Sequence, residues 1–385
     1  MRNCAASFVG GVWNMVFVGN TGSFPPDHCG NHGQQVPSSV AAAAPVIAEK
    51  PYISIDTRGL YSLNVPRSER NKVGPTLDFA ADSFDFSLVY VATAGDSAAA
   101  INAKLALGLH VILTPGTYSL ESPIAITRPN TVILGIGFPI LVPTTAAPCI
   151  TVADVDGVRV AGLLLQAGRL TSSTLLQFGS GGYAGSESNP SFIHDVFARV
   201  GGMNDPEDYQ VSAETMMTIG SGHVVVDNVW LWRADHCVKG QVYNSSNYVG
   251  TGLVVNGSNV TAYGVAVEHT LHDLLQWNGE DGRLYFYQSE FPYDVTQDSF
   301  GDKGFVGYRV ADHVQNHEAM GLGMYSFFRD HNVTVKSAAQ TGPSPGVVIT
   351  HPCTKFLNGM GAIDHVINAQ GASTSSAMDP PVYVC

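Results

Sequence analysis

The fold is decided by two stretches of the sequence, Val265-Ala-Val-Glu268-His-Thr270 and Tyr285-Phe-Tyr-Gln-Ser-Glu290-Phe-Pro-Tyr-Asp294. Both have the β-branched and aromatic composition of strands, and their two glutamates are 22 residues apart. This interval is about one turn of a parallel β-helix. Glu268 and Glu290 are therefore predicted to occupy equivalent positions on adjacent rungs, one strand spacing (~4.8 Å) apart.

Two carboxylates at that separation cannot both ionise easily, because like charges repel. One of them is expected to keep its proton near neutral pH, as a general acid that cleaves a glycosidic bond must. The alternative for Glu290 is a solvated charge beside a β-turn. The pair is the clearest indication of catalysis in the chain.

Paired strand-like segments recur along the chain and are broken by Asp-Gly, Asn-Gly and similar turns. Their spacing is irregular, about 20 to 35 residues, which is typical of a solenoid whose coils carry loops of variable length. An antiparallel sandwich would give similar local signals. The segments begin at Thr131, Ile150, Val224, Gly252 and Gly282.

One short helix is expected between Gly95 and Gly108, with Asp96 as its N-cap, Ile101 and Leu105 on one face, and Gly108 as its stop. A helix at the N-terminal end of a stack of coils would cap an open edge that could otherwise pair with other chains.

Composition limits the function. The chain has 385 residues, of which 45% are hydrophobic and 13% charged, as in a globular or solenoid protein. A net charge of −13 argues against nucleic acid or an anionic membrane as the main partner, and a neutral substrate fits better. No run is long and apolar enough to span a membrane, and no cofactor is predicted.

The six cysteines (4, 29, 149, 237, 353 and 385) lack metal-type spacing, so a zinc site is not expected. Cys4 with Cys29 and Cys353 with Cys385 are the disulfides that sequence proximity favours, and buried free thiols are the alternative. Sequons at 244, 256, 259 and 332 hint at a secreted glycoprotein, although no signal peptide is recognisable.

The segments Trp230–His236, Asn256–His269 and Gln276–Asp294 resemble glycoside hydrolase family 55, whose members are β-1,3-glucanases. The resemblance extends over almost the whole chain but covers only the second half of such an enzyme. It implies an all-β fold, a single-stranded right-handed parallel β-helix of the pectate-lyase-like kind, because the family has two such helices side by side, joined by a long linker.

The resemblance also implies a division of the chain. Residues 1–18 are expected to be a remnant coil of a missing first β-helix, 19–83 an extended linker, 84–372 the β-helix with the active site, and 373–385 a tail. The expected partner is β-1,3-glucan, and the protein is expected to be a secreted monomer or to pack against the missing helix.

Carried over by position, the resemblance makes Glu290 the general acid and Glu268 the carboxylate that helps to position the hydrolytic water. It implies inversion, whereas a simply stacked pair would favour retention, since inverting pairs lie roughly 6.5 to 9.5 Å apart. Because the family's cleft lies between its two helices, this chain is expected to have weak activity or none. A non-catalytic carbohydrate-binding protein is the main alternative, and a polysaccharide lyase, which usually needs an acidic calcium cluster, is a weaker one.

Trp277 and Tyr293 are the predicted platforms for a sugar ring, because aromatic faces pack against the apolar side of glucose. Gln288 is a further candidate for substrate binding. Asp294 either binds sugar hydroxyls or closes a turn, and His269 either orients a carboxylate or is a hydrogen-bonded structural residue.

Alternation along a strand gives further expectations. Trp230 and Trp232 share a face and are expected to be buried, with sugar stacking as the alternative. Tyr285 and Tyr287 are expected on the face opposite Phe286. An internal salt bridge or a turn network accounts for the cluster of Arg233, Asp235 and His236.

Overall fold

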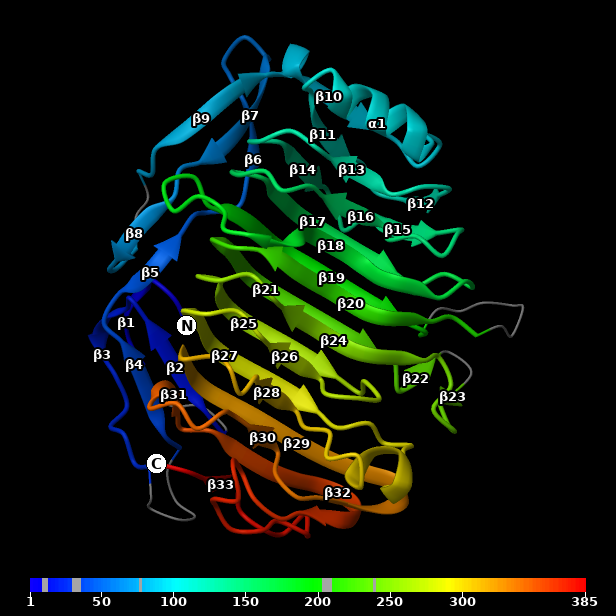
Figure 1. Ribbon diagram of the computed structural model, residues 1–385. Coiled ribbons are helices and arrows are strands. Elements are labelled where there is room, and N and C mark those ends of the chain that lie inside the picture. Colours follow the sequence, from blue (N-terminus) through cyan, green and yellow to red (C-terminus); the bar gives the residue numbers. More distant parts are fainter. Residues whose placement is uncertain (9–12, 30–35, 76–77, 203–209, 238–239) are drawn as a thin grey trace.

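The computed structural model describes residues 1–8, 13–29, 36–75, 78–202, 210–237 and 240–385, and these residues form an almost entirely β structure (Figure 1). Two large sheets dominate the described part of the chain. The 14-stranded sheet contains β10 (Val89–Ala92), β11 (His110–Leu113), β12 (Thr117–Leu120), β14 (Val132–Gly135), β15 (Ile140–Pro143), β17 (Arg159–Gln166), β19 (Ser191–Val200), β21 (Val224–Arg233), β25 (Thr261–Glu268), β27 (Gly282–Glu290), β29 (Asn316–Val335), β31 (Gly346–Thr350), β32 (Cys353–Ile363) and β33 (Val382–Tyr383). The 8-stranded sheet contains β13 (Ile124–Ile126), β16 (Ile150–Val152), β18 (Ser172–Tyr183), β20 (Ala213–Ser221), β24 (Val249–Val255), β26 (Leu275–Trp277), β28 (Tyr308–Val310) and β30 (Ala339–Gln340).

From β16 to β30 the chain runs back and forth between the two sheets, and each strand of these two sheets pairs in parallel with the equivalent strand of the next coil. The alternative of an antiparallel sandwich is therefore wrong. Only β33 runs antiparallel to its neighbour β32 among the described strands of the larger sheet. Successive coils appear as stacked rungs (Figure 1).

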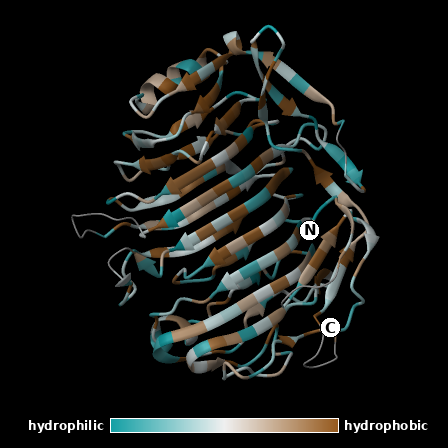
Figure 2. Ribbon diagram, turned by 180° about the vertical axis from the view of Figure 1, so that it is seen from behind, coloured by the Kyte–Doolittle hydropathy of each residue, from teal (hydrophilic) through white to brown (hydrophobic). Residues whose placement is uncertain are grey.

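The main hydrophobic core fills the space between the two sheets. Val226, Val265 and Tyr287 enter it from the larger sheet, and Leu253 and Leu275 from the smaller one. Hydrophobic residues follow the rungs, whereas many of the connections between them are hydrophilic (Figure 2). The core therefore runs the length of the stack, as the short apolar segments of the sequence require.

Six strands of the larger sheet bend at the same place, where one residue has a positive φ and is skipped in the pairing register. Asn, Asp and Gly adopt this conformation most easily. The bend divides the outer face of the sheet into a part before it and a part after it. The bend residues are Gly162, Asp195, Asn228, Gly264, Phe286 and Gly321.

The bend makes one expectation wrong. Phe286 has a φ of 70° and interrupts the alternation, so Tyr285 and Tyr287 do not share a face. Tyr285 packs on the outer face of the sheet, whereas Tyr287 lies in the main core.

The N-terminal segment covers the part of the outer face that precedes the bend. Val16 and Val46 of this segment pack there against Phe192, Tyr263 and Tyr285. Its strands form small sheets of two or three strands: β1 (Ala5–Ser7) with β3 (Thr21–Ser23), β2 (Met15–Val18) with β4 (Ser38–Ala41), β5 (Ala44–Ile47) with β8 (Glu69–Lys72), and β6 (Tyr52–Ile55), β7 (Tyr61–Pro66) and β9 (Ala81–Asp85). The part of the outer face after the bend carries the glutamate pair.

The predicted helix is present as α1 (Ala98–Ala106), at the end of the stack beside β10 and β11 (Figure 1). Its buried residues include Ile101 and Leu105, as expected. The N-cap is Ser97 and not Asp96, whose carboxylate binds the backbone of Thr93 instead. Two short helical turns, η1 (Phe86–Leu88) and η2 (Gln297–Gly301), complete the described helices, and none of the helices in these ranges is long and apolar enough to cross a membrane.

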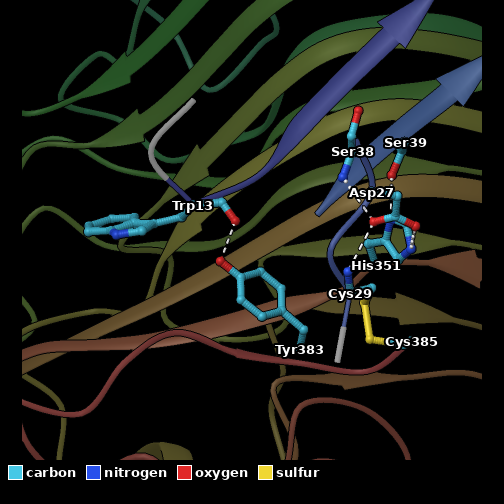
Figure 3. Close-up of a disulfide and its surroundings, with 8 residues drawn as sticks. All are labelled: Trp13, Asp27, Cys29, Ser38, Ser39, His351, Tyr383 and Cys385. Carbon is cyan, nitrogen blue, oxygen red and sulfur yellow. Dashed lines mark hydrogen bonds and ion pairs between the residues drawn. A yellow bond between two sulfur atoms is a disulfide. The ribbon is translucent and has the colours of Figure 1, made fainter. Parts of the chain in front are cut away.

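Both disulfides favoured by sequence proximity are wrong. Cys29 is bonded to Cys385, across a sequence separation of 356 residues, because the coils bring the C-terminal strand beside the N-terminal segment (Figure 3). Cys4 is an exposed free thiol and Cys353 a buried one. The remaining short hairpin, β22 (His236–Cys237) with β23 (Gly240–Gln241), follows β21.

Candidate active site

Glu268 and Glu290 are directly paired in the parallel register of β25 and β27. The spacing of 22 residues is thus one coil, as predicted, and places the two residues at adjacent strands of one sheet. Trp232 precedes them in the same column of the outer face and Tyr325 follows them. The two carboxylates therefore lie between Trp232 and Tyr325 in this column.

Glu268 is 9% exposed and is held by hydrogen bonds. The indole Nε1 of Trp230 donates to its Oε2 at 2.8 Å, and the nearby side-chain amide of Gln288 also favours the ionised form. Burial, followed by the nearby charge of Glu290, raises the pKa of Glu268 to about 7. This carboxylate is thus fixed in orientation and titrates near neutral pH.

Glu290 is half-buried, and its Oε2 accepts a hydrogen bond from the hydroxyl of Tyr293. Burial raises the pKa of Glu290. The ring of Tyr293 is itself fixed between His269 and Phe327, with centroid distances of 4.4 and 4.8 Å. With both pKa values raised, the pair of glutamates favours a state that holds a proton near neutral pH.

Trp230 and Trp232 are not both buried. Trp230 is 42% exposed, and the two rings stack with centroids 5.3 Å apart. They project outwards because Val229 and Leu231 fill the core side of the same strand, an alternation that the sequence already contained. The exposed indole of Trp230, bonded to Glu268, is therefore an aromatic platform beside the pair, as in the alternative of sugar stacking, whereas the sequence favoured Trp277 and Tyr293 for this role.

The prediction for Trp277 is wrong. Its side chain is 0% exposed and lies in the main core, against the ring of His317. Leu275 and Trp277 alternate with Gln276 in β26, so the two apolar residues face inwards together. Trp277 supports the site from inside the coil and does not reach its surface.

Asp294 and His269 lie beneath the site. Both carboxylate oxygens of Asp294 are occupied by the guanidinium of Arg233, at 2.9 and 2.8 Å, and one also accepts the backbone N–H of Ser245. Asp294 therefore forms a buried ion pair with Arg233. An internal salt bridge was expected for Arg233, but its partner is Asp294 and not Asp235 or His236. His269 is also buried, which lowers its pKa to about 4, so its imidazole is neutral near pH 7.

Asp235 is a third carboxylate at the rim of the site that the sequence had placed only in a turn network. Its Oδ1 accepts from Trp232 Nε1 at 3.3 Å and contacts His236 Nδ1 at 3.1 Å. It also lies 3.7 Å from His269 Nε2. Its negative charge contributes to the raised pKa values of both Glu268 and Glu290.

Within the described ranges, no group of three or more His, Cys, Asp or Glu side chains could hold a metal ion. The arrangement of the site fits proton transfer by carboxyl groups, beside aromatic rings that can pack against a sugar.

Known proteins are similar to this chain in sequence and fold. Residues 89–290 match the family described as the LAM55 pectate lyase-like domain. The chain is 36% identical, over 388 aligned residues, to an exo-beta-1,3-glucanase of Streptomyces sp. (strain SirexAA-E / ActE). This alignment covers 97% of the chain and 61% of that relative, so the chain spans less than two thirds of its length.

The solved structures of sacteLam55A from Streptomyces sp. SirexAA-E superpose with a TM-score of 0.92 at 34% identity, and one of them is a variant in complex with glucose. The superposition covers 100% of the chain and 69% of the solved one. The resemblance inferred from the motifs around the two glutamates is therefore confirmed. The chain belongs to the LAM55 pectate lyase-like family of glycoside hydrolase family 55.

Proposed function

We propose that this protein is a glycoside hydrolase that cleaves β-1,3-glucan by an inverting acid/base mechanism. The observation that carries the proposal is the paired register of Glu268 and Glu290, with each carboxylate held by a different aromatic residue. The name of its Streptomyces relative, an exo-beta-1,3-glucanase, supports this substrate.

Glu290 is the proposed general acid. It is the more exposed of the two glutamates and can reach a glycosidic oxygen, and burial raises its pKa. A protonated carboxyl can then transfer its proton to the leaving oxygen.

Glu268 is proposed to position the hydrolytic water. The hydrogen bond from Trp230 fixes its orientation, and together with the nearby amide of Gln288 it opposes the rise in pKa that burial causes. A carboxylate oxygen that these donors leave free can accept a hydrogen bond from water and draw off its proton as the water attacks the sugar.

The two carboxylates have different hydrogen-bond partners, which favours different orientations of their side chains. Glu268 binds Trp230, which belongs to the preceding strand β21, whereas Glu290 binds Tyr293, which follows the end of its own strand. This divergence supports a separation larger than the strand spacing and leaves room for water, as inversion requires.

We also propose a division of the chain, a cellular location and an oligomeric state. We propose that residues 84–372 form a right-handed parallel β-helix, with α1 as the cap of its first coil. The segments 1–18, 19–83 and 373–385 are proposed as a coil outside this helix, a linker and a tail. A disulfide between Cys29 and Cys385 supports an oxidising, extracellular location. A monomer in solution is also proposed.

Glu290→Gln tests the catalytic assignment. The variant keeps the volume of the side chain but cannot donate an acidic proton, so it is expected to release at least 1000-fold less sugar from laminarin, with an unchanged melting temperature. Turnover near the wild-type rate would refute the role of Glu290. If the unaltered chain binds laminarin but releases no reducing ends, the alternative of a carbohydrate-binding protein is favoured.

A further inference from the structure

The N-terminal segment brings an aromatic residue to the candidate site. Trp13 precedes β2 and packs edge-on against Tyr325, with ring centroids 4.9 Å apart. Tyr325 is the residue paired with Glu290 on the next strand. Trp13 is half-buried, so part of this residue remains accessible.

Tyr325 serves as the support of this indole. Its side chain leans back over Gly323, since a Cβ added to Gly323 would lie 2.2 Å from the tyrosine hydroxyl oxygen. Burial raises the pKa of Tyr325, and its hydroxyl interacts with the thiol of Cys353. Tyr325 is only 5% exposed, so Trp13 presents the aromatic surface at this position.

Three contacts fix the backbone around Trp13. The hydroxyl of Tyr383 donates to the carbonyl oxygen of Trp13 at 2.6 Å (Figure 3), and the side-chain amide of Asn14 donates to the carbonyl oxygen of Gly321 at 2.9 Å. Two residues beyond Tyr383, Cys385 forms the disulfide to Cys29. The C-terminal strand β33 therefore holds Trp13 against the large sheet.

We propose that Trp13 is a substrate-contacting residue, which forms the wall of the cleft on the Tyr325 side of Glu290. The exposed indole of Trp230 lies on the opposite side, beside Glu268, so the glutamates lie between two aromatic surfaces. An aromatic ring on each side suits a glucan chain, whose sugar rings have apolar faces and hydroxyl rims. This proposal rests on the proposed function.

The test compares Trp13→Ala, Trp13→Phe and the control Tyr61→Ala, which removes an exposed ring far from the site in β7. Affinity for a β-1,3-gluco-oligosaccharide is measured by calorimetry, and kcat and KM are measured wherever turnover is detectable. Trp13→Ala is expected to weaken binding and to raise KM about tenfold with little change in kcat. Trp13→Phe is expected to retain most of the affinity, and Tyr61→Ala all of it.

Melting temperatures separate substrate contact from support of the fold. Wild-type affinity in Trp13→Ala would overturn the proposal, as would an equal loss in Trp13→Ala and Trp13→Phe that follows a fall in melting temperature. If the unaltered chain neither binds nor hydrolyses the oligosaccharide, the proposed function itself fails. If the unaltered chain is active and Trp13→Ala has the same affinity and kinetics, only the proposal for Trp13 fails.

Discussion

The indole nitrogen of Trp230 and the carboxylate of Glu268 are joined by a hydrogen bond of 2.8 Å between neighbouring strands. The bond stabilises the ionised carboxylate and so opposes the effect of burial on its pKa.

Trp230→Phe keeps an aromatic ring but removes the N–H donor. The pKa of Glu268 is then expected to rise further, because the ionised form loses a hydrogen bond. kcat/KM on laminarin should fall about 10- to 100-fold, as expected for loss of a bond worth about 1.5–3 kcal/mol to a charged group. The acid limb of the pH–rate profile should move to higher pH, and an unchanged profile would contradict the role of Trp230.

The raised pKa of Glu268 also predicts a pH-dependent stability. Its folded-state pKa of about 7 lies above the value of an unfolded chain, ~4.3. Its favourable contribution is fully present below pH ~4.3 and is lost as the pH rises through 7. Glu268→Gln, which cannot ionise, should therefore be more stable than the wild type at pH 8, by about 1–3 kcal/mol.

Urea unfolding at pH 4 and pH 8 measures this effect. The difference between Glu268→Gln and the wild type should be small at pH 4 and large at pH 8. Glu318→Gln is a suitable control, because Glu318 lies in the same sheet with its side chain 37% exposed. An equal difference at both pH values would exclude the titration of Glu268 as the cause.

The ion pair of Arg233 and Asp294 is almost completely buried, with side chains 1% and 3% exposed. Arg233→Met leaves a buried carboxylate without its cation and is expected to cost about 3–5 kcal/mol of unfolding free energy. Arg233→Met combined with Asp294→Leu removes both charges and should recover much of this loss. Thermal unfolding of the single and double variants checks the prediction, and additive losses would contradict it.

The disulfide between Cys29 and Cys385 can be tested against the pairing that proximity favoured. Cys29→Ser and Cys385→Ser should each lower the unfolding free energy by about 2–4 kcal/mol under oxidising conditions. Cys4→Ser is the matched control and should have almost no effect, because Cys4 is exposed and free. Destabilisation by Cys4→Ser equal to that by Cys29→Ser would instead support a bond between those two residues.

The sequence predicted the features that depend on local spacing. The interval between Glu268 and Glu290 predicted their stacking, because each coil of a parallel stack returns the chain to the same column. The composition around Ile101 and Leu105 predicted α1. Both predictions depend on residues that are close in sequence.

The sequence did not predict features that depend on long-range packing or on one unusual residue. Cys29 meets Cys385 only after all the coils are stacked. The positive φ of Phe286 ended the alternation that was expected to place Tyr285 with Tyr287. Trp277 was predicted to be exposed and Trp230 to be buried, and the structure shows the reverse. Aromatic size alone does not show whether a side chain lies on the core side of a strand or on the outer side.

The bend in the larger sheet also determines which sequence changes the site can tolerate. Gly264 precedes Glu268 by the same interval as Phe286 precedes Glu290, so each bend sets the starting point from which the glutamate is positioned. An insertion in a loop between coils lengthens that loop but does not change the interval between the bend and the glutamate. One residue added between a bend and its glutamate would turn the carboxylate towards the core. Evolution can therefore vary the loops around this site while the interval from bend to glutamate stays fixed.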